Sequence, residues 1–204
     1  MKRIVCFGDS NTYGFIPGKG NRYDEHTRWT GRLSELLAPK GYTVIEQGKN
    51  GRTTVFDDKT APDRNGSEAL EQLFRRMPPP EYLVMMLGTN DCKTQFHADA
   101  AMITEGMALL VSMVRMYWSD TAIWLLSPAP LETACFSGQM GSKFDADSVS
   151  KSRELPANYR ELARKTGCRF LCVGDIVKAD PADGVHLGAA SHAILAERLA
   201  ACFS

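Results

Sequence analysis

Four short polar segments of the sequence carry residues that could together perform acyl transfer. They are Gly8-Asp9-Ser10-Asn11-Thr12, Gly48-Lys49-Asn50-Gly51-Arg52-Thr53-Thr54, Gly88-Thr89-Asn90-Asp91 and Asp183-Gly184-Val185-His186. Three of them directly follow apolar runs, and the fourth lies beyond the last run. If the runs are parallel strands, the segments meet at one edge of the sheet, because the carboxyl ends of parallel strands share that edge. A hydroxyl, a backbone N–H, a carboxamide and a carboxylate–imidazole pair could then converge, as acyl transfer requires.

Ser10, His186 and Asp183 are the candidate catalytic residues. A serine hydroxyl is a poor nucleophile until a base takes its proton, and an imidazole, with an unperturbed pKa of about 6.5, is a suitable base near neutrality. Asp183, three residues before His186, could accept the other ring N–H and stabilise the imidazolium. The backbone N–H groups of Ser10 and Gly51 and the side-chain amide of Asn90 are the candidate oxyanion-hole donors.

Each segment, taken alone, also has a structural explanation. Gly-Asp-Ser and Gly-Thr-Asn-Asp are common turn and helix-cap sequences, and Asp183 could form a simple Asx turn ahead of a helix. Four independent turns would rarely supply Ser, Gly, Asn and Asp-x-x-His in this order, so their co-occurrence favours one shared site. Asp9 is interpreted as a brace for its turn. Asp91 and Lys93 could orient the neighbouring asparagine or form a surface pair, and a structural role is favoured.

The apolar runs that must position these residues are continuous rather than alternating, as strands buried on both faces are. Helices are expected between the runs, and one of them carries Ile103, Met107, Leu110, Val114 and Tyr117 on a single face. The alternation predicts an α/β fold, a three-layer α/β/α sandwich with a five-stranded parallel sheet, forming one domain over residues 1–204. The expected strands are 4–7, 43–45, 82–87, 122–126 and 170–173, and the expected helices are 29–38, 67–77, 99–117, 147–166 and 188–202.

The segment from Ser127 to about Ala146 interrupts this alternation. It contains two prolines and two glycines and has weak periodicity, so we expect a long loop at the carboxyl edge of the sheet. Ligands of open α/β sheets bind at that edge, and long loops in compact domains are often lids.

Composition excludes several classes of partner. The 204 residues include 24 basic and 24 acidic side chains, so the formal net charge is zero, and a nucleic-acid or anionic-membrane surface is not expected. The six cysteines are too sparse for a disulfide framework, and Cys168-x3-Cys172 is a lone pair where a structural zinc site needs four ligands. A structural zinc site is therefore not expected. The sequence also lacks the phosphate loop Gly-x4-Gly-Lys-[Ser/Thr] and the dinucleotide fingerprint Gly-x-Gly-x-x-Gly.

The N-terminal residues run directly into Gly8-Asp9-Ser10 without an apolar segment of signal-peptide length. No continuous apolar run approaches the roughly 18 residues of a membrane span. A cytoplasmic protein without a membrane span is the expectation from these two features.

The four polar segments resemble those of the SGNH, or GDSL-type, hydrolases, and the match spans almost the whole chain. Five further segments are similar to the aryl esterase/acyltransferase (perhydrolase-type) subgroup: Arg28-Trp29-Thr30-Gly31, Arg52-Thr53-Thr54, Asp57-Asp58, Asn65-Gly66 and residues 86–93. The resemblance implies a flavodoxin-like sandwich and ester hydrolysis through an acyl-serine, without cofactor. It assigns Ser10 as nucleophile, His186 as base and Asp183 as orienting acid.

Two positions depart from the pattern of the resemblance. Position 11 is Asn where the GDSL name has Leu, which lies outside the reacting atoms and leaves the mechanism intact. Position 51 is Gly where some members of the subgroup have Ala, and both supply a backbone N–H. The chemistry is therefore expected to be unchanged, with a possible difference in pocket size.

The expected substrate is a small ester with a short acyl group, with transfer to an acceptor other than water as an extension. Sugar O-acetyl groups, lysophospholipids and thioesters remain open as substrates, and a non-catalytic binding domain is the alternative from another class. The subgroup resemblance also suggests a homo-oligomer, with the 50s loop and residues 127–146 as contacts. The candidate pocket residues, each equally compatible with core packing, are Tyr13, Phe15, Trp29, Phe56 and Phe96.

Overall fold

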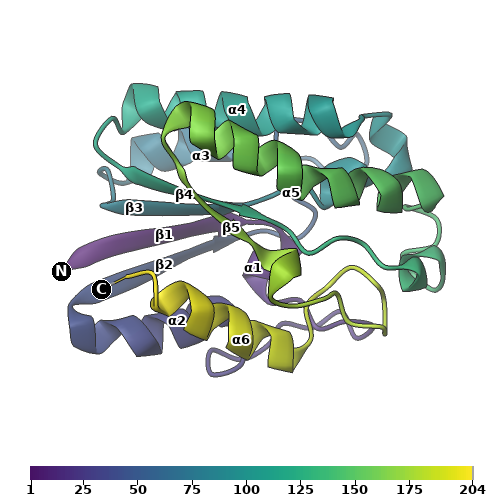
Figure 1. The fold of residues 1–204 in the computed structure, drawn as a ribbon, viewed down its shortest axis with the longest axis horizontal. Helices are drawn as coiled ribbons and strands as arrows, with labels where there is room; N and C mark the ends of the chain where they lie inside the picture. The colour runs from purple at the N-terminus through teal and green to yellow at the C-terminus, as the bar shows by residue number, and fades with distance from the viewer. Residues whose placement is uncertain (204) are drawn as a thin grey trace.

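The computed structural model describes residues 1–203 and has a five-stranded parallel sheet at its centre, in the order β2-β1-β3-β4-β5 (Figure 1). The strands are β1 (Lys2–Gly8), β2 (Tyr42–Gly48), β3 (Tyr82–Met86), β4 (Ala122–Ser127) and β5 (Arg169–Cys172). The helices are α1 (Ser10–Tyr13), α2 (Trp29–Leu37), α3 (Gly66–Arg76), α4 (Ala100–Tyr117), α5 (Ala146–Thr166) and α6 (Ala189–Ala200). All five predicted strands and five predicted helices are present, and the short α1 is additional.

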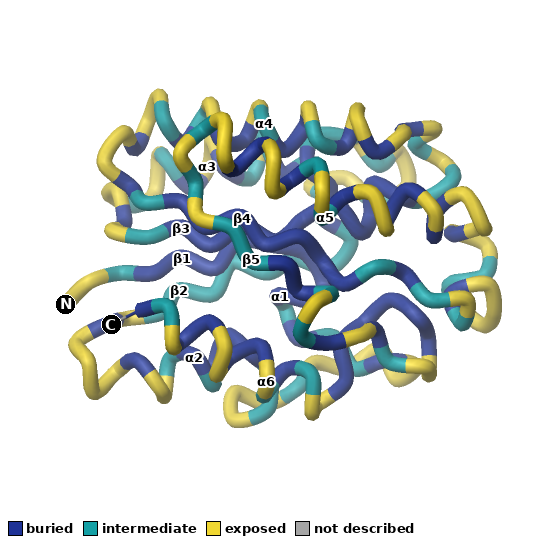
Figure 2. The backbone as a smooth tube through the Cα atoms, in the orientation of Figure 1, coloured by how far each residue is buried: buried dark blue, intermediate teal, exposed yellow. Residues whose placement is uncertain are grey.

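Two helical layers cover the two faces of the sheet. Helices α3, α4 and α5 lie on one face and α2 and α6 on the other, as Figure 1 shows. Alternate residues of β1 enter the two cores, because side chains of a strand point to opposite faces: Val5 and Phe7 pack on the α3–α5 side, and Ile4 and Cys6 on the α2–α6 side. Figure 2 shows the central strands buried between the layers. The predicted three-layer sandwich is confirmed.

The strand order creates a switch point beside β1. Gly8 at the end of β1 pairs with Gly48 of β2 on one side and with Met86 of β3 on the other. The chain segments that leave these three strands therefore start side by side. A sheet in the order 2-1-3-4-5 is flavodoxin-like, and ligands of such sheets bind at this point. The sequence segments that contain Ser10, Gly51 and Asn90 all begin here.

Two glycines allow α1 to cross directly over the ends of β1 and β2. A Cβ atom on Gly48 would lie 2.2 Å from the backbone nitrogen of Tyr13, and one on Gly8 would lie 2.8 Å from Thr12 Cβ; both neighbours belong to α1. Both distances are shorter than any real Cβ contact, so glycine is required at each position. The close approach places Ser10, the first residue of α1, at the edge of the sheet.

Residues 127–146 form the expected long loop, with one turn of 3-10 helix at Thr133–Phe136. Two hydrogen bonds fix its course: the Glu132 N–H donates to the Gly184 carbonyl at 2.9 Å, and the Leu131 N–H donates to Ser152 Oγ at 3.0 Å. The loop is thereby tied to the Asp183–His186 segment on one side and to α5 on the other.

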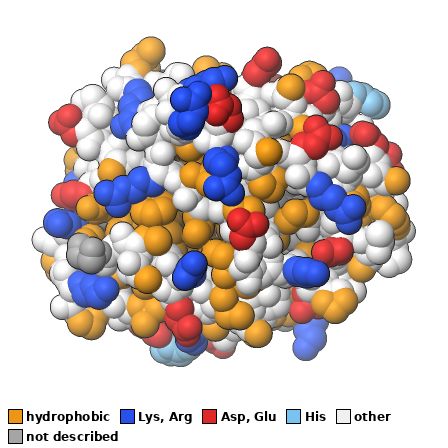
Figure 3. Space-filling view, in the orientation of Figure 1, with side chains coloured by type: hydrophobic (Ala, Val, Ile, Leu, Met, Phe, Trp, Pro, Cys, Tyr) orange, Lys and Arg blue, Asp and Glu red, His pale blue; other side chains and the backbone are white. Residues whose placement is uncertain are grey.

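Helix α4 is long and apolar enough, by length and composition alone, to qualify as a membrane span. In this fold its predicted apolar face is a core face, because Ile103, Met107, Leu110 and Val114 are fully buried against the sheet. The prediction was wrong for Tyr117, which is exposed and stacks on Phe74 with ring centroids 4.8 Å apart. On the molecular face seen in Figure 3, basic and acidic side chains are interspersed, in keeping with the zero net charge.

Candidate active site

The structure brings Ser10, His186 and Asp183 into one chain of hydrogen bonds. His186 Nε2 lies 2.9 Å from Ser10 Oγ, and His186 Nδ1 lies 2.7 Å from Asp183 Oδ2. Ser10 is the first residue of α1, whereas the other two precede α6, 173 to 176 positions further along the chain. All three side chains are buried, with 5–6% of each residue exposed. The arrangement can remove a proton from the serine hydroxyl and hold the resulting imidazolium.

The two oxygens of Asp183 have separate partners. Oδ1 accepts the backbone N–H groups of Val185 and His186, both at 2.9 Å, which is the Asx turn that the sequence also allowed. This turn leaves Oδ2 directed at the imidazole. Burial raises the pKa of Asp183, but the hydrogen bond and charge of His186 together with the two backbone N–H groups outweigh burial and lower the pKa to about 2. The carboxylate is therefore ionised at neutral pH and keeps the Nδ1–H tautomer of the ring.

Two neighbours fix the imidazole from outside the hydrogen-bond chain. The Phe15 ring lies over the His186 ring with centroids 4.3 Å apart. Asn11, next to the serine, donates from Nδ2 to the Val185 carbonyl at 3.2 Å and accepts the Leu187 N–H at 2.9 Å. Asn11 thus joins the serine turn to the histidine segment, a role that sequence reasoning missed. A leucine at this position could make neither bond.

The candidate oxyanion donors lie beside Ser10. Gly51 adopts a φ of +79°, in the left-handed region that favours glycine, and its N–H donates to no acceptor among residues 1–203. The Asn90 amide donates to the Arg52 carbonyl at 3.1 Å, and its nitrogen lies 3.5 Å from Asp9 Oδ2, a distance too long for a strong bond. One amide hydrogen of Asn90 is therefore held by the backbone, and the other can reach a substrate oxygen.

Arg52 is a buried residue whose positioning role the sequence did not reveal. Its guanidinium donates to the Gly8 carbonyl at 2.8 Å and to the Gln47 carbonyl, and it lies 4.3 Å from the centre of the Phe7 ring. Burial lowers the pKa of Arg52 to about 10, so the group is still charged at neutral pH. It ties together the ends of β1 and β2, from which the segments carrying Ser10 and Gly51 depart.

The two aspartates near the site have structural partners. Asp9 accepts the Asn11 N–H at 2.9 Å and caps α1, as interpreted from the sequence. Asp91 is fully buried and accepts both the N–H and the hydroxyl of Thr54, at 2.8 and 2.5 Å. Burial raises the pKa of each carboxyl to about 6. Because Asp91 is buried, the alternative of a surface pair with Lys93 is wrong.

A cavity of about 250 Å³ opens beside the Ser10–His186 pair. The loop of residues 127–146 supplies four of its lining residues, so this predicted loop does cover the site. The sequence identified the loop but none of these individual side chains. The complete lining is Ser10, Phe15, Asn50, Gly51, Asn90, Lys93, Gln139, Met140, Lys143, Phe144, Val185 and His186.

Of the five aromatic pocket candidates, Phe15 lines this cavity and the other four do not. Trp29 is a core residue: it has no exposed surface, it packs in the α2–α6 core, and its indole N–H donates to the Asn11 carbonyl at 3.0 Å. Phe56 and Phe96 pack against each other, with centroids 5.7 Å apart, and against the opposite core. Tyr13 lies under the guanidinium of Arg22, 4.5 Å from its ring centre.

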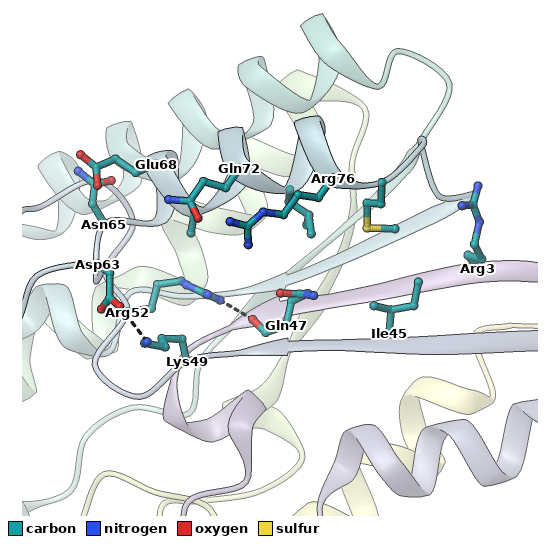
Figure 4. Close-up of a pocket in the computed structure, with 13 residues that line it drawn as sticks. Arg3, Ile45, Gln47, Lys49, Arg52, Asp63, Asn65, Glu68, Gln72 and Arg76 are labelled. Atoms are coloured by element: carbon teal, nitrogen blue, oxygen red, sulfur yellow. Dashed lines mark hydrogen bonds and ion pairs between the residues drawn. The ribbon is translucent and has the colours of Figure 1, made fainter.

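A larger cavity, about 520 Å³, lies along the edge strand β2 and α3. Figure 4 shows Gln47 on β2 and Lys49 directly after it on one side of the cavity, and Gln72 and Arg76 of α3 on the other, with Lys49 paired to Asp63 at one end. Its lining includes no Ser, Thr, Cys or His, so it offers neither a hydroxyl or thiol nucleophile nor an imidazole base. Among residues 1–203, no group of three His, Cys, Asp or Glu side chains is placed to hold a metal ion.

Comparison with protein families and solved structures gives a consistent result. The model of the GDSL-like lipase/acylhydrolase family matches residues 6–194. Comparison with curated proteins finds no match.

Several solved structures are similar over nearly the whole length of both chains. The M. smegmatis aryl esterase is 32% identical, with a TM-score of 0.92 over 99% of this chain and 98% of its own. Est24, a carbohydrate acetylesterase from Sinorhizobium meliloti, is 32% identical with a TM-score of 0.89 over the same shares. A putative arylesterase from Agrobacterium tumefaciens is 34% identical with a TM-score of 0.87, also over 99% and 98%.

Proposed function

This chain belongs to the GDSL-like lipase/acylhydrolase family and is an ester hydrolase, and from this premise we propose that it is a serine esterase acting on small esters with short acyl groups. The observation that carries the proposal is the hydrogen-bond chain from Ser10 through His186 to Asp183 at the wall of a cavity. Such a chain supplies a nucleophile, a base and an orienting acid in one place.

In the first half of the proposed reaction, the ester acylates the enzyme. His186 Nε2 takes the hydroxyl proton of Ser10 as Oγ attacks the carbonyl carbon of the substrate. The Asp183 carboxylate, which is ionised at neutral pH, stabilises the imidazolium. The imidazolium then gives this proton to the alcohol oxygen, the ester C–O bond breaks, and an acyl-serine remains.

The negative charge of both tetrahedral intermediates falls on the former carbonyl oxygen. The backbone N–H groups of Ser10 and Gly51 and the Asn90 amide are proposed to receive it. The left-handed backbone of Gly51 and the bond from Asn90 to the Arg52 carbonyl fix two of these donors in advance. Donors that are fixed before the reaction stabilise the transition state without reorganisation.

In the second half, water releases the acyl group. His186 takes a proton from the water molecule, the resulting hydroxide attacks the acyl carbon, and the proton returns to Ser10 Oγ as the acid leaves. Transfer to another alcohol or to peroxide would follow the same course, with that acceptor in place of water. Phe15, Met140 and Phe144 line the cavity, and such apolar walls favour an organic acceptor over water.

Cavity size supports short acyl groups. At about 250 Å³, the cavity is smaller than the roughly 300–1,000 Å³ of sites for drug-sized ligands. Sugar O-acetyl esters are a second candidate substrate, favoured by the similarity to Est24. Hydrolysis of nitrophenyl and naphthyl esters of increasing acyl length, measured beside acetylated sugars, separates the two. A sharp fall beyond four carbons is expected for the first, and activity on sugars alone would assign the second.

Replacement of the nucleophile tests the mechanism. Ser10→Ala removes Oγ and should abolish turnover of every ester that the wild-type protein hydrolyses, with an unchanged circular dichroism spectrum. Ser137→Ala, an exposed serine in the loop over the site, is the matched control and should keep activity. Esterase activity retained in Ser10→Ala would refute the assignment. A wild-type protein that turns over neither activated esters nor acetylated sugars would instead be a non-catalytic binding domain.

A further inference from the structure

Two lysines from different parts of the chain stand next to each other at the rim of the candidate active site. Lys93 follows the 3-10 helix Asn90–Cys92, and Lys143 belongs to the loop over the cavity. The backbone N–H of Thr94 donates to the Lys143 carbonyl at 3.0 Å, and this bond holds the two segments side by side. Both lysines line the cavity that contains Ser10 and His186.

The same two lysines line a second cavity, of about 270 Å³, next to the first. The two cavities share Asn50, Gly51, Lys93 and Lys143. Beyond this shared wall the second cavity extends away from His186, towards Asp58 and Arg64. A substrate with its ester at Ser10 can therefore place another group between the lysines, past the oxyanion donor Gly51.

The lining of the second cavity is predominantly basic. Lys93, Lys143 and Arg64 face a single carboxylate, that of Asp58. Asp58 Oδ1 is already occupied, because it accepts the N–H and the hydroxyl of Thr60 at 3.0 and 2.6 Å. Arg64 is also engaged, since its guanidinium donates to the Asn50 carbonyl. The two lysines are left as the positive groups available to a ligand.

Neither lysine forms a direct ion pair within residues 1–203. No carboxylate of residues 1–203 lies within 4.0 Å of Lys93 or Lys143, whereas Lys151, another lysine with little exposed surface, lies 3.3 Å from Asp147. Lys93 is half-buried and Lys143 is exposed. Burial and the charge of Lys143 lower the pKa of Lys93, against smaller opposing effects of the Asp58, Asp9 and Asp91 carboxylates. A half-buried ammonium beside a second ammonium is unfavourable until an anion joins them, so the pair favours a negatively charged ligand.

We propose that the ester hydrolysed at this site carries an anionic group, a carboxylate or a phosphate, and that Lys93 and Lys143 bind this group. The inference rests on the proposed function, since it concerns the substrate of the same serine. It makes the two lysines specificity-determining residues: they raise the turnover of a charged ester over that of its neutral analogue. A lysine that only stabilised the oxyanion would raise the turnover of the charged ester and of its neutral analogue by the same factor.

The test compares esters that differ only in charge. The first pair, 4-nitrophenyl hydrogen succinate and 4-nitrophenyl methyl succinate, places the charge on the acyl half and keeps the acyl group at four carbons. The second pair, 4-acetoxybenzoate and methyl 4-acetoxybenzoate, places it on the alcohol half. The ratio of kcat/KM values within each pair, corrected for spontaneous hydrolysis, is measured for the wild type and the variants. A preference for the anionic ester in the first pair would show that the acyl half of the substrate lies at the lysines. A preference in the second pair would show that the alcohol half does.

Substitution of the lysines should remove that preference. In Lys93→Met with Lys143→Met, the ratio in favour of the anionic ester is expected to fall about ten-fold, as for one partly desolvated and one exposed ion pair. Arginine at both positions should keep most of it, and 0.5 M KCl should weaken it in the wild type through screening. Lys178→Met, at an exposed lysine outside both cavities, is the matched control and should leave the ratio unchanged.

The outcomes separate this inference from the proposed function. If the wild type hydrolyses the neutral esters through Ser10 but prefers neither anionic ester, the inference fails and the esterase assignment stands. If the double methionine variant loses activity on neutral and anionic esters by the same factor, the lysines act without selecting charge, and the inference also fails. If no ester of either pair is hydrolysed but acetylated sugars are, the inference fails and the esterase assignment moves to sugars; if acetylated sugars are not hydrolysed either, both proposals are refuted.

Discussion

Asn11 shows how one side chain outside the reacting atoms can align a catalytic pair. Its two hydrogen bonds run to the Val185 carbonyl and the Leu187 N–H, on both sides of His186, while its own backbone continues from Ser10. The distance between Ser10 and His186 therefore depends on Asn11. Small displacements of reacting groups can reduce rates strongly, so this residue is expected to affect turnover without touching substrate.

Asn11→Leu tests that role. It leaves a buried carbonyl and a buried N–H without partners, which should cost about 1–3 kcal/mol of unfolding free energy. Misalignment of His186 should also lower kcat about ten-fold or more, with a smaller effect on KM. Urea denaturation and steady-state kinetics measure the two effects. Asn21→Leu, at an exposed asparagine, is the control. A variant with wild-type kcat and stability would show that the two bonds do not position the histidine.

Asp91 makes stability depend on pH in a predictable direction. Burial raises its pKa from 3.8 to about 6, so between these pH values the folded protein binds a proton that the unfolded chain has released. The unfolding free energy contributed by this group is therefore highest below about pH 4 and decreases as the pH rises through 6. Asp9 has the same shift, with burial again as its main cause, and adds to the trend.

Asp91→Asn should remove one of these contributions, because asparagine keeps an acceptor for Thr54 but cannot ionise. The substitution is expected to be more destabilising at pH 4 than at pH 7, by about 2 kcal/mol. Urea denaturation at the two pH values measures the difference, with Asp120→Asn at an exposed position as control. An effect of Asp91→Asn that is the same at both pH values would contradict the assigned shift.

At the scale of elements, the strands and helices could be predicted because the buried face of each one is marked by an apolar pattern within its own short stretch of sequence. Continuous apolar runs mark strands covered on both faces, and the 3.6-residue spacing in α4 marks its core face. The contacts of the long loop could not be predicted in the same way. Met140 and Phe144 reach the site because the loop bonds to residues 152 and 184, and no local pattern encodes those bonds.

The pocket candidates show the same limit. Trp29 and Phe15 are both aromatic and both follow the serine segment, yet one is a fully buried core residue and the other covers His186. Which of them faces the cavity depends on how α2 packs against α6, a contact between distant parts of the chain. The catalytic candidates were easier to identify, because each follows a strand or precedes a helix at the same edge of the sheet.

Gly106 lets α4 approach the loop that supports the oxyanion donors. A Cβ atom there would lie 2.4 Å from Thr54 Oγ1, the hydroxyl that bonds to Asp91. Gly106→Ala should therefore destabilise the fold by about 1–3 kcal/mol through overpacking, although alanine is the better helix former by about 1 kcal/mol. The melting temperature of Gly106→Ala, compared with that of the wild type, shows whether the substitution destabilises the fold. Ala101→Gly, at an exposed position of the same helix, measures the difference in helix propensity between alanine and glycine alone. A Gly106→Ala variant more stable than the wild type would contradict the close contact.

At the scale of the whole molecule, we propose that copies of this chain associate, as the subgroup resemblance suggests. Met102, Leu109 and Met116, spaced seven residues apart on α4, are 44, 50 and 76% exposed, and we include this row of apolar side chains in the proposed contact. Sedimentation velocity at micromolar concentration should give a species larger than the 22.5 kDa chain. A single species of monomer mass across the concentration range would contradict the proposal.

The balanced charge of the molecule leaves recognition of substrate to local groups. With 24 basic and 24 acidic side chains, the protein has no net field to attract a charged ester from a distance. The two unpaired lysines at the cavity act only at short range. This arrangement suits a small ligand that is selected at the site rather than steered towards it.

The central claim is that Ser10 is the nucleophile of an ester hydrolase, and labelling with a fluorophosphonate tests it most directly. The reagent forms a stable bond only with a serine that a neighbouring base has activated. Peptide mass spectrometry should find one phosphonyl group per chain, on Ser10, together with complete loss of esterase activity and no labelling of Ser10→Ala. Full esterase activity after complete labelling, or a label on any other residue that inactivates the enzyme, would contradict the account.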